Sequence, residues 1–114
     1  MTASECIFCR IVAGEIPSTV VYEDETVLAI RDIQPVAPTH VLVLPRAHLE
    51  SVHSADLDGD TVVALIRAAQ LVAEHEGLAH DGYRLVTNVG EHGGQTVNHL
   101  HWHVLGGRAL ASMG

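Results

Sequence analysis

Lysine is absent from this sequence of 114 residues, and all six of its basic residues are arginines. The chain therefore has neither the lysine of a Walker-type phosphate-binding loop nor a lysine that could form a Schiff base. Acidic residues number 14, which gives a formal net charge of −8, and the arginines are scattered along the chain. This distribution leaves no basic stripe for the phosphate backbone of a nucleic acid, so we expect no nucleic-acid partner.

Long apolar runs are absent as well. No segment reaches the roughly 18 consecutive apolar residues that a membrane span needs. The first residues, MTASECIFCR, lack the basic region and apolar core of a signal peptide. We therefore expect a cytoplasmic protein with no membrane partner. The length suits one domain covering residues 1–114, and the sequence contains no internal repeat or linker.

The hydrophobic periodicity predicts an α+β fold. A helical period from Asp58 to about Glu76 is typical of an amphipathic helix, with Asp58 or Asp60 as its N-cap and Gly77 after its end. The short connections within each group of strands favour an antiparallel five-stranded sheet. The expected elements are a short N-terminal helix within residues 5–17, strands at 19–24, 26–32 and 40–46, one long helix at 58–76, and strands at 83–89 and 99–107.

Nine histidines are unusual in so short a chain, and three of them alternate as His99, His101 and His103. On a strand their side chains share one face, with Leu100 and Trp102 on the other. Same-face neighbours are roughly 6.6 to 7 Å apart, whereas the donor atoms around one tetrahedral zinc are only ~3.3 Å apart. A metal site that uses all three is therefore awkward, although two of them with ligands from elsewhere would fit. The polar face of a half-buried strand and a catalytic cluster are the other interpretations.

The residues just before the three histidines favour catalysis. The segment GEHGGQTV, residues 90–97, brings glycines and then Gln95 and Thr96 to the start of the strand. Glycines let a backbone approach a ligand closely and can direct N–H groups at an anion. Neutral imidazole is a nucleophile, so one ring can attack phosphorus while a neighbouring protonated ring stabilises the phosphate oxygens. The pattern thus predicts a phosphate site that needs neither lysine nor metal.

Residues 99–105, His-Leu-His-Trp-His-Val-Leu, fit the pattern His-φ-His-φ-His-φ-φ, in which φ is apolar. With CIFCRIVAGEIPSTVVYEDE, RDIQPVAPTHVLVLPRAH and GYRLVTNVGEHGGQTVNHLHWHVLGGR, the sequence resembles the histidine triad (HIT) superfamily over nearly its whole length. The LGGR after the third histidine is similar to the Hint branch, the purine nucleoside phosphoramidases, whereas the Fhit branch usually has proline there. The resemblance implies a HIT-like fold and nucleotidyl transfer to a histidine, followed by hydrolysis.

The resemblance also implies how single residues would cleave the P–N bond of a purine nucleoside 5′-monophosphoramidate and release AMP or GMP. His101 would attack the α-phosphorus, with its other ring nitrogen donating to the backbone carbonyl of His99. His103 would stabilise the phosphate oxygens, and His40 would support the cluster. Asp32 would accept both ribose hydroxyls. The remaining substrate-binding residues that it implies are Asn88, Gly94, Gln95 and Thr96 near the phosphate, and Ile7, Phe8, Ile11, Ile33 and Leu42 around the base.

Cys6 and Cys9 stand in C-x-x-C spacing, which alone fits zinc, a redox pair or two buried thiols. A thioredoxin-like pair needs a βαβ context that this region lacks, and a structural disulfide is not expected in a reducing cytoplasm. The resemblance implies Zn²⁺ bound by both cysteines with His48 and His99. Such a closed tetrahedral set is structural, so the chemistry itself requires no cofactor. The other histidines match no motif and are expected at the surface: His53, His75, His80 and His92.

Two other functions stay open at this point. One is hydrolysis of dinucleoside polyphosphates, as in the Fhit branch, and the other is a nucleotide-binding regulatory module with little turnover. The resemblance also implies a homodimer joined through the long helix and an edge strand, which the modest core of one helix on one sheet would favour. The C-terminal GGRALASMG lacks the tryptophan and prolines common in Hint tails, which leaves the choice of leaving group open.

Overall fold

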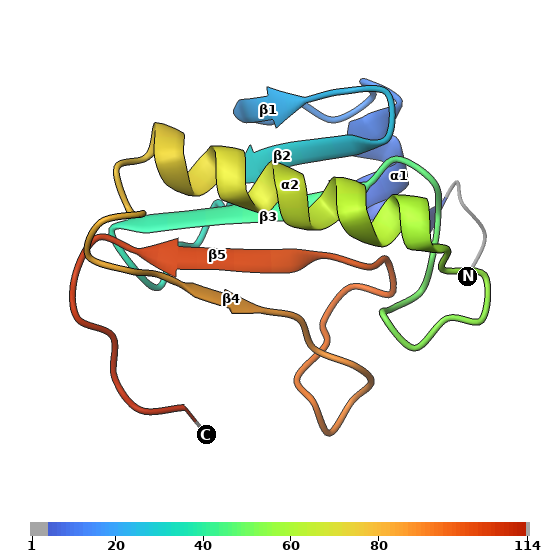
Figure 1. Cartoon of the computed structure of the whole chain (residues 1–114). Coiled ribbons are helices and arrows are strands. Elements are labelled where there is room, and N and C mark those ends of the chain that lie inside the picture. The colour runs from blue at the N-terminus through green and yellow to red at the C-terminus, as the bar shows by residue number, and fades with distance from the viewer. Residues whose placement is uncertain (1–4, 114) are drawn as a thin grey trace.

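The computed structural model describes residues 5–113. Helices and strands follow one another in the predicted order, and the strands form one sheet with a helix, α2, across one of its faces (Figure 1). This arrangement confirms the predicted α+β fold. The elements are α1 (Ile7–Val12), β1 (Val20–Glu23), β2 (Val27–Arg31), β3 (Thr39–Pro45), α2 (Gly59–His75), β4 (Arg84–Val86) and β5 (Trp102–Gly106).

Every neighbouring pair of strands is antiparallel, in the order β1-β2-β3-β5-β4. β3 and β4 run parallel to each other, because each is antiparallel to β5, which lies between them. The chain between these two parallel strands contains α2, in keeping with the dozen or more residues that such a crossover needs. β3 is the central strand, and its register with β5 brings His40 opposite Leu105 and Leu42 opposite His103.

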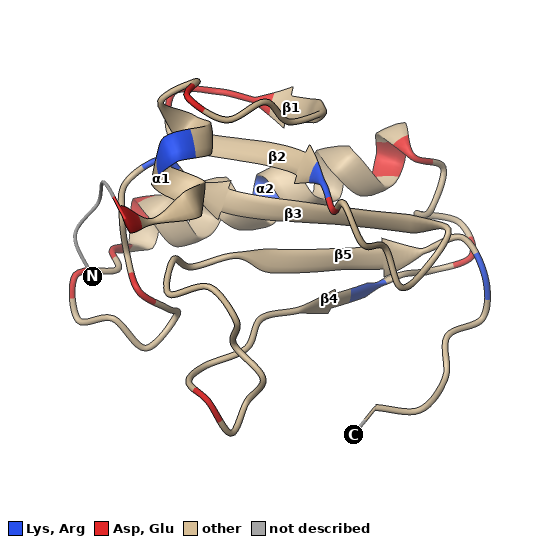
Figure 2. Ribbon diagram, turned by 180° about the vertical axis from the view of Figure 1, so that it is seen from behind, with Lys and Arg blue, Asp and Glu red and all other residues tan. Residues whose placement is uncertain are grey.

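β3 is buried along its whole length, because both faces of the sheet are covered there. Val41 and Val43 belong to the core beneath α2, whereas Leu42 and Leu44 belong to a second apolar cluster on the other face. Figure 2 shows this other face, with α1 lying near one end of β2 and β3. The alternating side chains of β3 therefore separate the main core from the face on which the candidate site lies.

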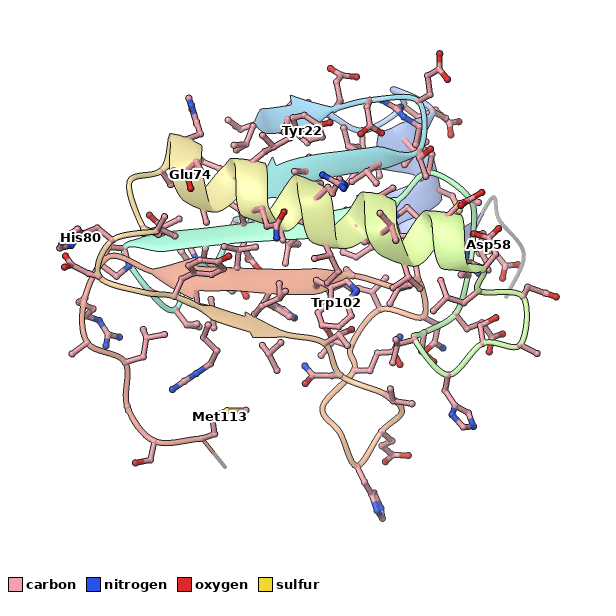
Figure 3. All side chains as sticks on the ribbon, viewed as in Figure 1. Tyr22, Asp58, Glu74, His80, Trp102 and Met113 are labelled. Carbon is pink, nitrogen blue, oxygen red and sulfur yellow. The ribbon has the colours of Figure 1, made fainter. Side chains whose placement is uncertain are left out.

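α2 begins and ends where the sequence predicts. The Asp58 carboxylate accepts a hydrogen bond of 2.7 Å from the Thr61 N–H, which makes Asp58 rather than Asp60 the N-cap (Figure 3). Gly77 follows the last turn with a φ of 73°, a left-handed conformation that glycine adopts readily. Within residues 5–113, neither helix combines the length and the apolar character needed to cross a bilayer. The buried stripe of α2 consists of Leu65, Ala68, Ala69, Val72 and Ala73.

The strand predicted over residues 99–107 begins later than expected, because β5 covers Trp102–Gly106. Ahead of β5, the Leu100 N–H donates to the carbonyl of Leu49, which lies in a loop rather than in a strand. The alternation of faces nevertheless holds, since Leu100 and Val104 both belong to the core beneath α2. The first two histidines of the triad thus lie on irregular chain and the third on the strand.

β4 is also shorter than the strand predicted at residues 83–89, and ends at Val86. Directly after it, the Thr87 hydroxyl donates to the carbonyl of His101 over 2.8 Å. A side chain here provides the hydrogen bond that a neighbouring strand would otherwise supply. The local alternation of the sequence could not reveal this substitution, so both strands were predicted too long.

Candidate active site

A pocket of about 300 Å³ opens on the α1 side of the sheet. Asp32, Thr96, His101 and His103 all contribute to its wall, so the fold brings together residues that are distant in the sequence. The five apolar residues predicted around a base line the same pocket: Ile7, Phe8, Ile11, Ile33 and Leu42. Sequence reasoning missed the other lining residues, which carry no motif of their own: Ile30, Arg31, Gln34 and Val97.

His101 is only 6% exposed, and a main-chain carbonyl sets its orientation. Its Nδ1 lies 2.7 Å from the carbonyl oxygen of His99. Because a carbonyl oxygen can only accept, the proton of the neutral ring is on Nδ1 and Nε2 carries a lone pair. The Phe8 ring packs edge-on against the imidazole, with ring centroids 5.0 Å apart. The neutral His101 ring is therefore held as one tautomer, with its Nε2 lone pair free, in the wall of the pocket.

His103 has the opposite tautomer, because a chain of hydrogen bonds runs behind it. The Val36 N–H donates to His40 Nδ1 over 3.2 Å, so the proton of the neutral His40 ring is on Nε2. This N–H faces His103 Nδ1 at 2.9 Å and an Asp32 carboxylate oxygen at 3.4 Å. Since His103 Nδ1 accepts, its own proton is on Nε2. The centroids of the neighbouring His101 and His103 rings are 5.0 Å apart. The two rings thus differ at Nε2, which has a lone pair in His101 and an N–H in His103.

Burial favours the neutral form of His40 and His103. The pKa of His103 is lowered to about 4, first by burial and then by repulsion from positive charge on His101 and His40. The pKa of His40 is also lowered, mainly by burial, against the opposing attraction of Asp32. In the free protein at neutral pH, His103 is therefore a neutral N–H donor. The prediction of a protonated ring beside the nucleophile is therefore wrong for the free protein, because withdrawal from water disfavours the charged form of histidine.

Three residues predicted near the phosphate do not line this pocket. The Gln95 side chain joins two loops. Its Oε1 accepts from the Gly90 N–H at 2.9 Å, within its own loop, and its Nε2 donates to the Glu50 carbonyl at 2.7 Å, in the loop after β3. Gly94 is exposed, with a φ of 84°, and Asn88 is half-buried beyond the end of β4. The Gln95 amide is engaged with backbone groups and does not reach the pocket.

Cys6, Cys9, His48 and His99 form a second cluster, which we call the thiol–imidazole cluster. Cys9 Sγ lies 3.2 Å from His48 Nδ1 and 3.5 Å from His99 Nδ1, and Cys6 Sγ lies 3.4 Å from His99 Nδ1. Sulfur and nitrogen ligands of one tetrahedral zinc are about 3.5 Å apart. The His99 Nε2–H donates to the Pro45 carbonyl at 2.8 Å, which leaves on Nδ1 the lone pair that a metal needs. The four side chains therefore fit a closed tetrahedral zinc site.

Without a metal ion, the surroundings of Cys9 favour its protonated thiol. Burial, followed by hydrogen bonding with Cys6 and repulsion from its charge, raises the pKa of the Cys9 thiol to about 11. A bound dication would reverse this shift, because metal-bound thiols lose their protons.

Asp32, His40 and His103 form another group of side chains with donor atoms that could bind a metal ion. His40 Nε2 and His103 Nδ1 lie 2.9 Å apart and are already joined by a hydrogen bond, so this group fits a metal ion less well than the thiol–imidazole cluster does.

The histidines without a motif are exposed, as predicted, and His80 lies beyond the end of α2 in Figure 3. Figure 2 shows the arginines distributed over helices, strands and loops. Within the described residues, His40, His99 and His101 are buried, and His48 and His103 are half-buried. The exposed ones are His53, His75, His80 and His92.

The match of sequence and fold to known proteins identifies the family. The model of the HIT domain matches residues 13–110. The chain belongs to the HIT domain family. This HIT protein is 46% identical over 112 residues to the purine nucleoside phosphoramidase of Escherichia coli (strain K12), across 97% of this chain and 94% of that protein. It is also 49% identical over 110 residues to a 14 kDa zinc-binding protein of Zea mays, across 94% of this chain and 85% of that protein.

A solved structure of a HIT family hydrolase from Clostridium thermocellum has the same fold. It matches this HIT protein with a TM-score of 0.92 and 46% sequence identity, over 98% of both chains. These similarities confirm the resemblance found in the sequence. The HIT protein is therefore an enzyme, a hydrolase of its family.

The burial of His103 makes the folding stability depend on pH. Its pKa of about 4 in the folded protein is below the ~6.5 of an exposed histidine, so between these values the unfolded chain binds more protons. The stabilising contribution of the neutral ring is complete above about pH 6.5 and is lost as the pH falls towards about 4. We expect the urea midpoint to fall more between about pH 7 and about pH 5 in the wild type than in His103→Gln.

Other buried histidines titrate in this range too, so the prediction concerns the difference between the two proteins rather than the loss in either one. The pKa values of His40 and His99 are also lowered, mainly by burial, and both residues are present in the two proteins. The thiol–imidazole cluster is likewise unchanged. Equal losses of stability in the wild type and in His103→Gln would contradict the assignment of a depressed pKa to His103.

Proposed function

We propose that this HIT protein hydrolyses purine nucleoside 5′-monophosphoramidates at the P–N bond and releases AMP or GMP. The observation that carries the proposal is the His101 ring, which the His99 carbonyl holds with its lone pair on Nε2 in a pocket that also contains the Asp32 carboxylate. A neutral imidazole fixed in this way is a nucleophile suited to phosphorus. The similarity to a purine nucleoside phosphoramidase supports the same choice of bond.

The nucleoside would bind through its ribose and its base. Asp32 Oδ1 accepts the Gln34 N–H at 2.7 Å, and a carboxylate keeps further lone pairs for two ribose hydroxyls. Ile33 is 93% exposed and Ile7 is 46% exposed in the free protein, although both line the pocket. A purine base stacked on these side chains would remove apolar surface from water, which is favourable by roughly 25 cal/mol per Å². The pocket therefore has an apolar part for the base and a polar part for the sugar and phosphate.

The reaction would proceed in two displacements. In the first, His101 Nε2 forms a bond to the α-phosphorus while the P–N bond to the leaving group breaks, and the departing nitrogen takes a proton from solvent. The His103 Nε2–H donates to a phosphoryl oxygen as negative charge develops there. In the second, a water oxygen bonds to phosphorus, the bond to His101 Nε2 breaks, and the water loses a proton to solvent. The His99 carbonyl holds the Nδ1 proton throughout.

Replacement of His101 tests this mechanism. We expect His101→Asn to lower kcat/KM for adenosine 5′-monophosphoramidate by about 10³-fold or more, because the nucleophile is lost while the pocket remains. Brief incubation with substrate should give an AMP adduct by intact-mass spectrometry in the wild type and none in the variant. His80→Asn, at an exposed position, is the matched control and should be fully active.

Three results would count against the proposal. Negligible turnover by the wild type with adenosine and guanosine phosphoramidates would leave the protein a nucleotide-binding module. Faster turnover of a dinucleoside polyphosphate would make it a polyphosphate hydrolase. Unchanged turnover in His101→Asn would assign the nucleophile to another residue.

We propose further that the thiol–imidazole cluster binds one structural Zn²⁺. The spacing of the sulfur and nitrogen atoms supports zinc, as does the similarity to a zinc-binding protein. Four protein ligands leave no open position, so the ion would join α1 and residue 48 to the start of the triad and supply no chemistry to the reaction. Its contribution would be to folding stability, because the unfolded chain lacks the assembled site.

Metal analysis of the purified protein tests this site. We expect about one zinc per chain in the wild type, and little zinc with a lower urea midpoint in Cys9→Ser, because one ligand and its charge are lost. His53→Asn changes an exposed histidine of the neighbouring loop and should keep both the zinc and the stability. A wild type free of zinc after purification without chelators, with Cys9→Ser equally stable, would refute the site.

We also propose that the protein forms a homodimer through the outer face of α2. Val63 is 53% exposed and Leu71 is 50% exposed on this helix, and Tyr83 follows it with 38% exposure. Two shallow hollows lie along these side chains, bordered by Arg67 and Glu74. In a twofold interface, a residue i of one chain contacts residue j of the other, and j of the first contacts i of the second. Arg67 of each chain can therefore pair with Glu74 of the other. An apolar face bordered by complementary charge suits a second copy of the same chain.

Sedimentation velocity tests the dimer. We expect the wild type to sediment as a dimer and Leu71→Glu as a monomer, because a charge placed in the apolar interface has no partner there. Val20→Glu introduces the same charge at another exposed apolar position, in the edge strand β1, and should stay dimeric. A monomeric wild type, or a dimeric Leu71→Glu, would contradict the interface.

A further inference from the structure

The Gly-Arg pair after the triad contacts the loop between β2 and β3. A Cβ atom added to Gly107 would lie 2.8 Å from Pro38 Cβ, so the backbone at residue 107 packs directly on this proline. The φ of Gly107 is +95°, which also favours glycine there. Arg108 Nη2 donates to the Val36 carbonyl over 3.2 Å. Two consecutive residues thus hold the segment 36–38 against the end of β5.

The held segment is also the one that orients His40. The carbonyl of Val36 accepts from Arg108, while the N–H of the same residue donates to His40 Nδ1 over 3.2 Å. The loop is closed at its base as well, because the Asp32 N–H donates to the His40 carbonyl over 3.0 Å. Displacement of Val36 would remove the only donor that the described structure gives to His40 Nδ1.

His40 without that donor would no longer be restricted to one tautomer. With Val36 in place, its proton is on Nε2 and is donated to His103 Nδ1. Without it, the hydrogen bond between the two rings can also run in reverse, from His103 Nδ1–H to His40 Nε2. In the reversed state, His103 presents a lone pair instead of an N–H to the pocket and loses its ability to donate to a phosphoryl oxygen.

We propose that Gly107 and Arg108 are positioning residues, which hold Val36 in place and thereby fix His40 and His103 as the tautomers that leave an N–H on His103 facing the phosphate. The catalytic part of this inference rests on the proposed phosphoramidase activity. The structural part concerns the free protein alone. Arg108 touches neither the pocket nor the reacting atoms, so its effect on catalysis would pass entirely through Val36 and His40.

Imidazole nitrogen NMR tests the structural part directly. Long-range ¹H–¹⁵N spectra of the wild type at neutral pH should give His40 and His103 as Nε2–H tautomers and His101 as the Nδ1–H tautomer. In Arg108→Met, the His40 Nδ1 resonance should move towards that of a protonated nitrogen, because the two directions of the His40–His103 bond exchange. Arg108→Lys keeps a donor within reach of the carbonyl and should restore most of the wild-type spectrum.

Arg84 provides a matched control. Its guanidinium also donates to a main-chain carbonyl, that of Ala111, over 2.8 Å, instead of to a carbonyl of the β2–β3 loop. Arg84→Met should therefore leave the His40 and His103 resonances where they are in the wild type. Gly107→Ala provides a second route, since its added methyl group displaces Pro38 and should shift the same resonances as Arg108→Met.

The kinetic part is measured on adenosine 5′-monophosphoramidate. We expect Arg108→Met to lower kcat about five- to tenfold, the usual effect of losing one neutral hydrogen bond, with KM changed less than about twofold. Arg84→Met should keep the wild-type kcat. We expect kcat to fall more than KM rises, because the hydrogen bond from the His103 N–H is strongest in the transition state, when charge develops on the phosphoryl oxygens.

The outcomes separate this inference from the proposed function. A tautomer shift in Arg108→Met together with a wild type that lacks phosphoramidase activity would support the positioning role and refute the proposed reaction. An active wild type with unshifted His40 and His103 resonances in Arg108→Met would overturn the positioning role. A lower kcat and urea midpoint with an unshifted spectrum would overturn it too, because Arg108 would then act on stability alone.

Discussion

The buried His99 is the residue on which the rest of the site depends, because both its side chain and its main chain are used. Its ring is fully buried, with Nδ1 beside the Cys6 and Cys9 sulfurs and the Nε2–H on the Pro45 carbonyl. Its own carbonyl accepts the Nδ1 proton of His101. Any displacement of His99 would move the group that sets the tautomer of the proposed nucleophile. The thiol–imidazole cluster and the pocket are therefore one structural unit.

Alternation along an extended chain places His101 and His103 on the same face but does not distinguish them. Their partners do. A carbonyl that can only accept lies behind His101, and an imidazole N–H lies behind His103. Nε2 of His101 consequently has a lone pair, whereas Nε2 of His103 has an N–H. In the proposed reaction, one ring would attack phosphorus and the other would stabilise its oxygens, with no proton exchanged between them. Burial, which lowers the pKa of His103 to about 4, keeps that ring neutral at neutral pH.

Much of the fold followed from local patterns. The helical period after Asp58 and the apolar run that became β3 were predictable, because each reflects the burial of nearby residues. The start of β5 was not, since Leu100 pairs with the loop residue Leu49. The position of Gln95 was also beyond local reasoning, because the carbonyl that fixes its amide belongs to Glu50, 45 residues away.

By itself, the sequence determined the α+β class and the side chains available for chemistry, because residue type and hydrophobic period are local properties. Five of the apolar residues that line the pocket were predicted only through the family resemblance. Only the tertiary structure decided which nitrogen of each histidine holds the proton and which side chains share a cluster. His40 and His103 are 63 positions apart, and Cys6 and His99 are 93 positions apart. A tautomer depends on the partner that a ring meets after folding, and no local pattern specifies a partner so distant along the chain.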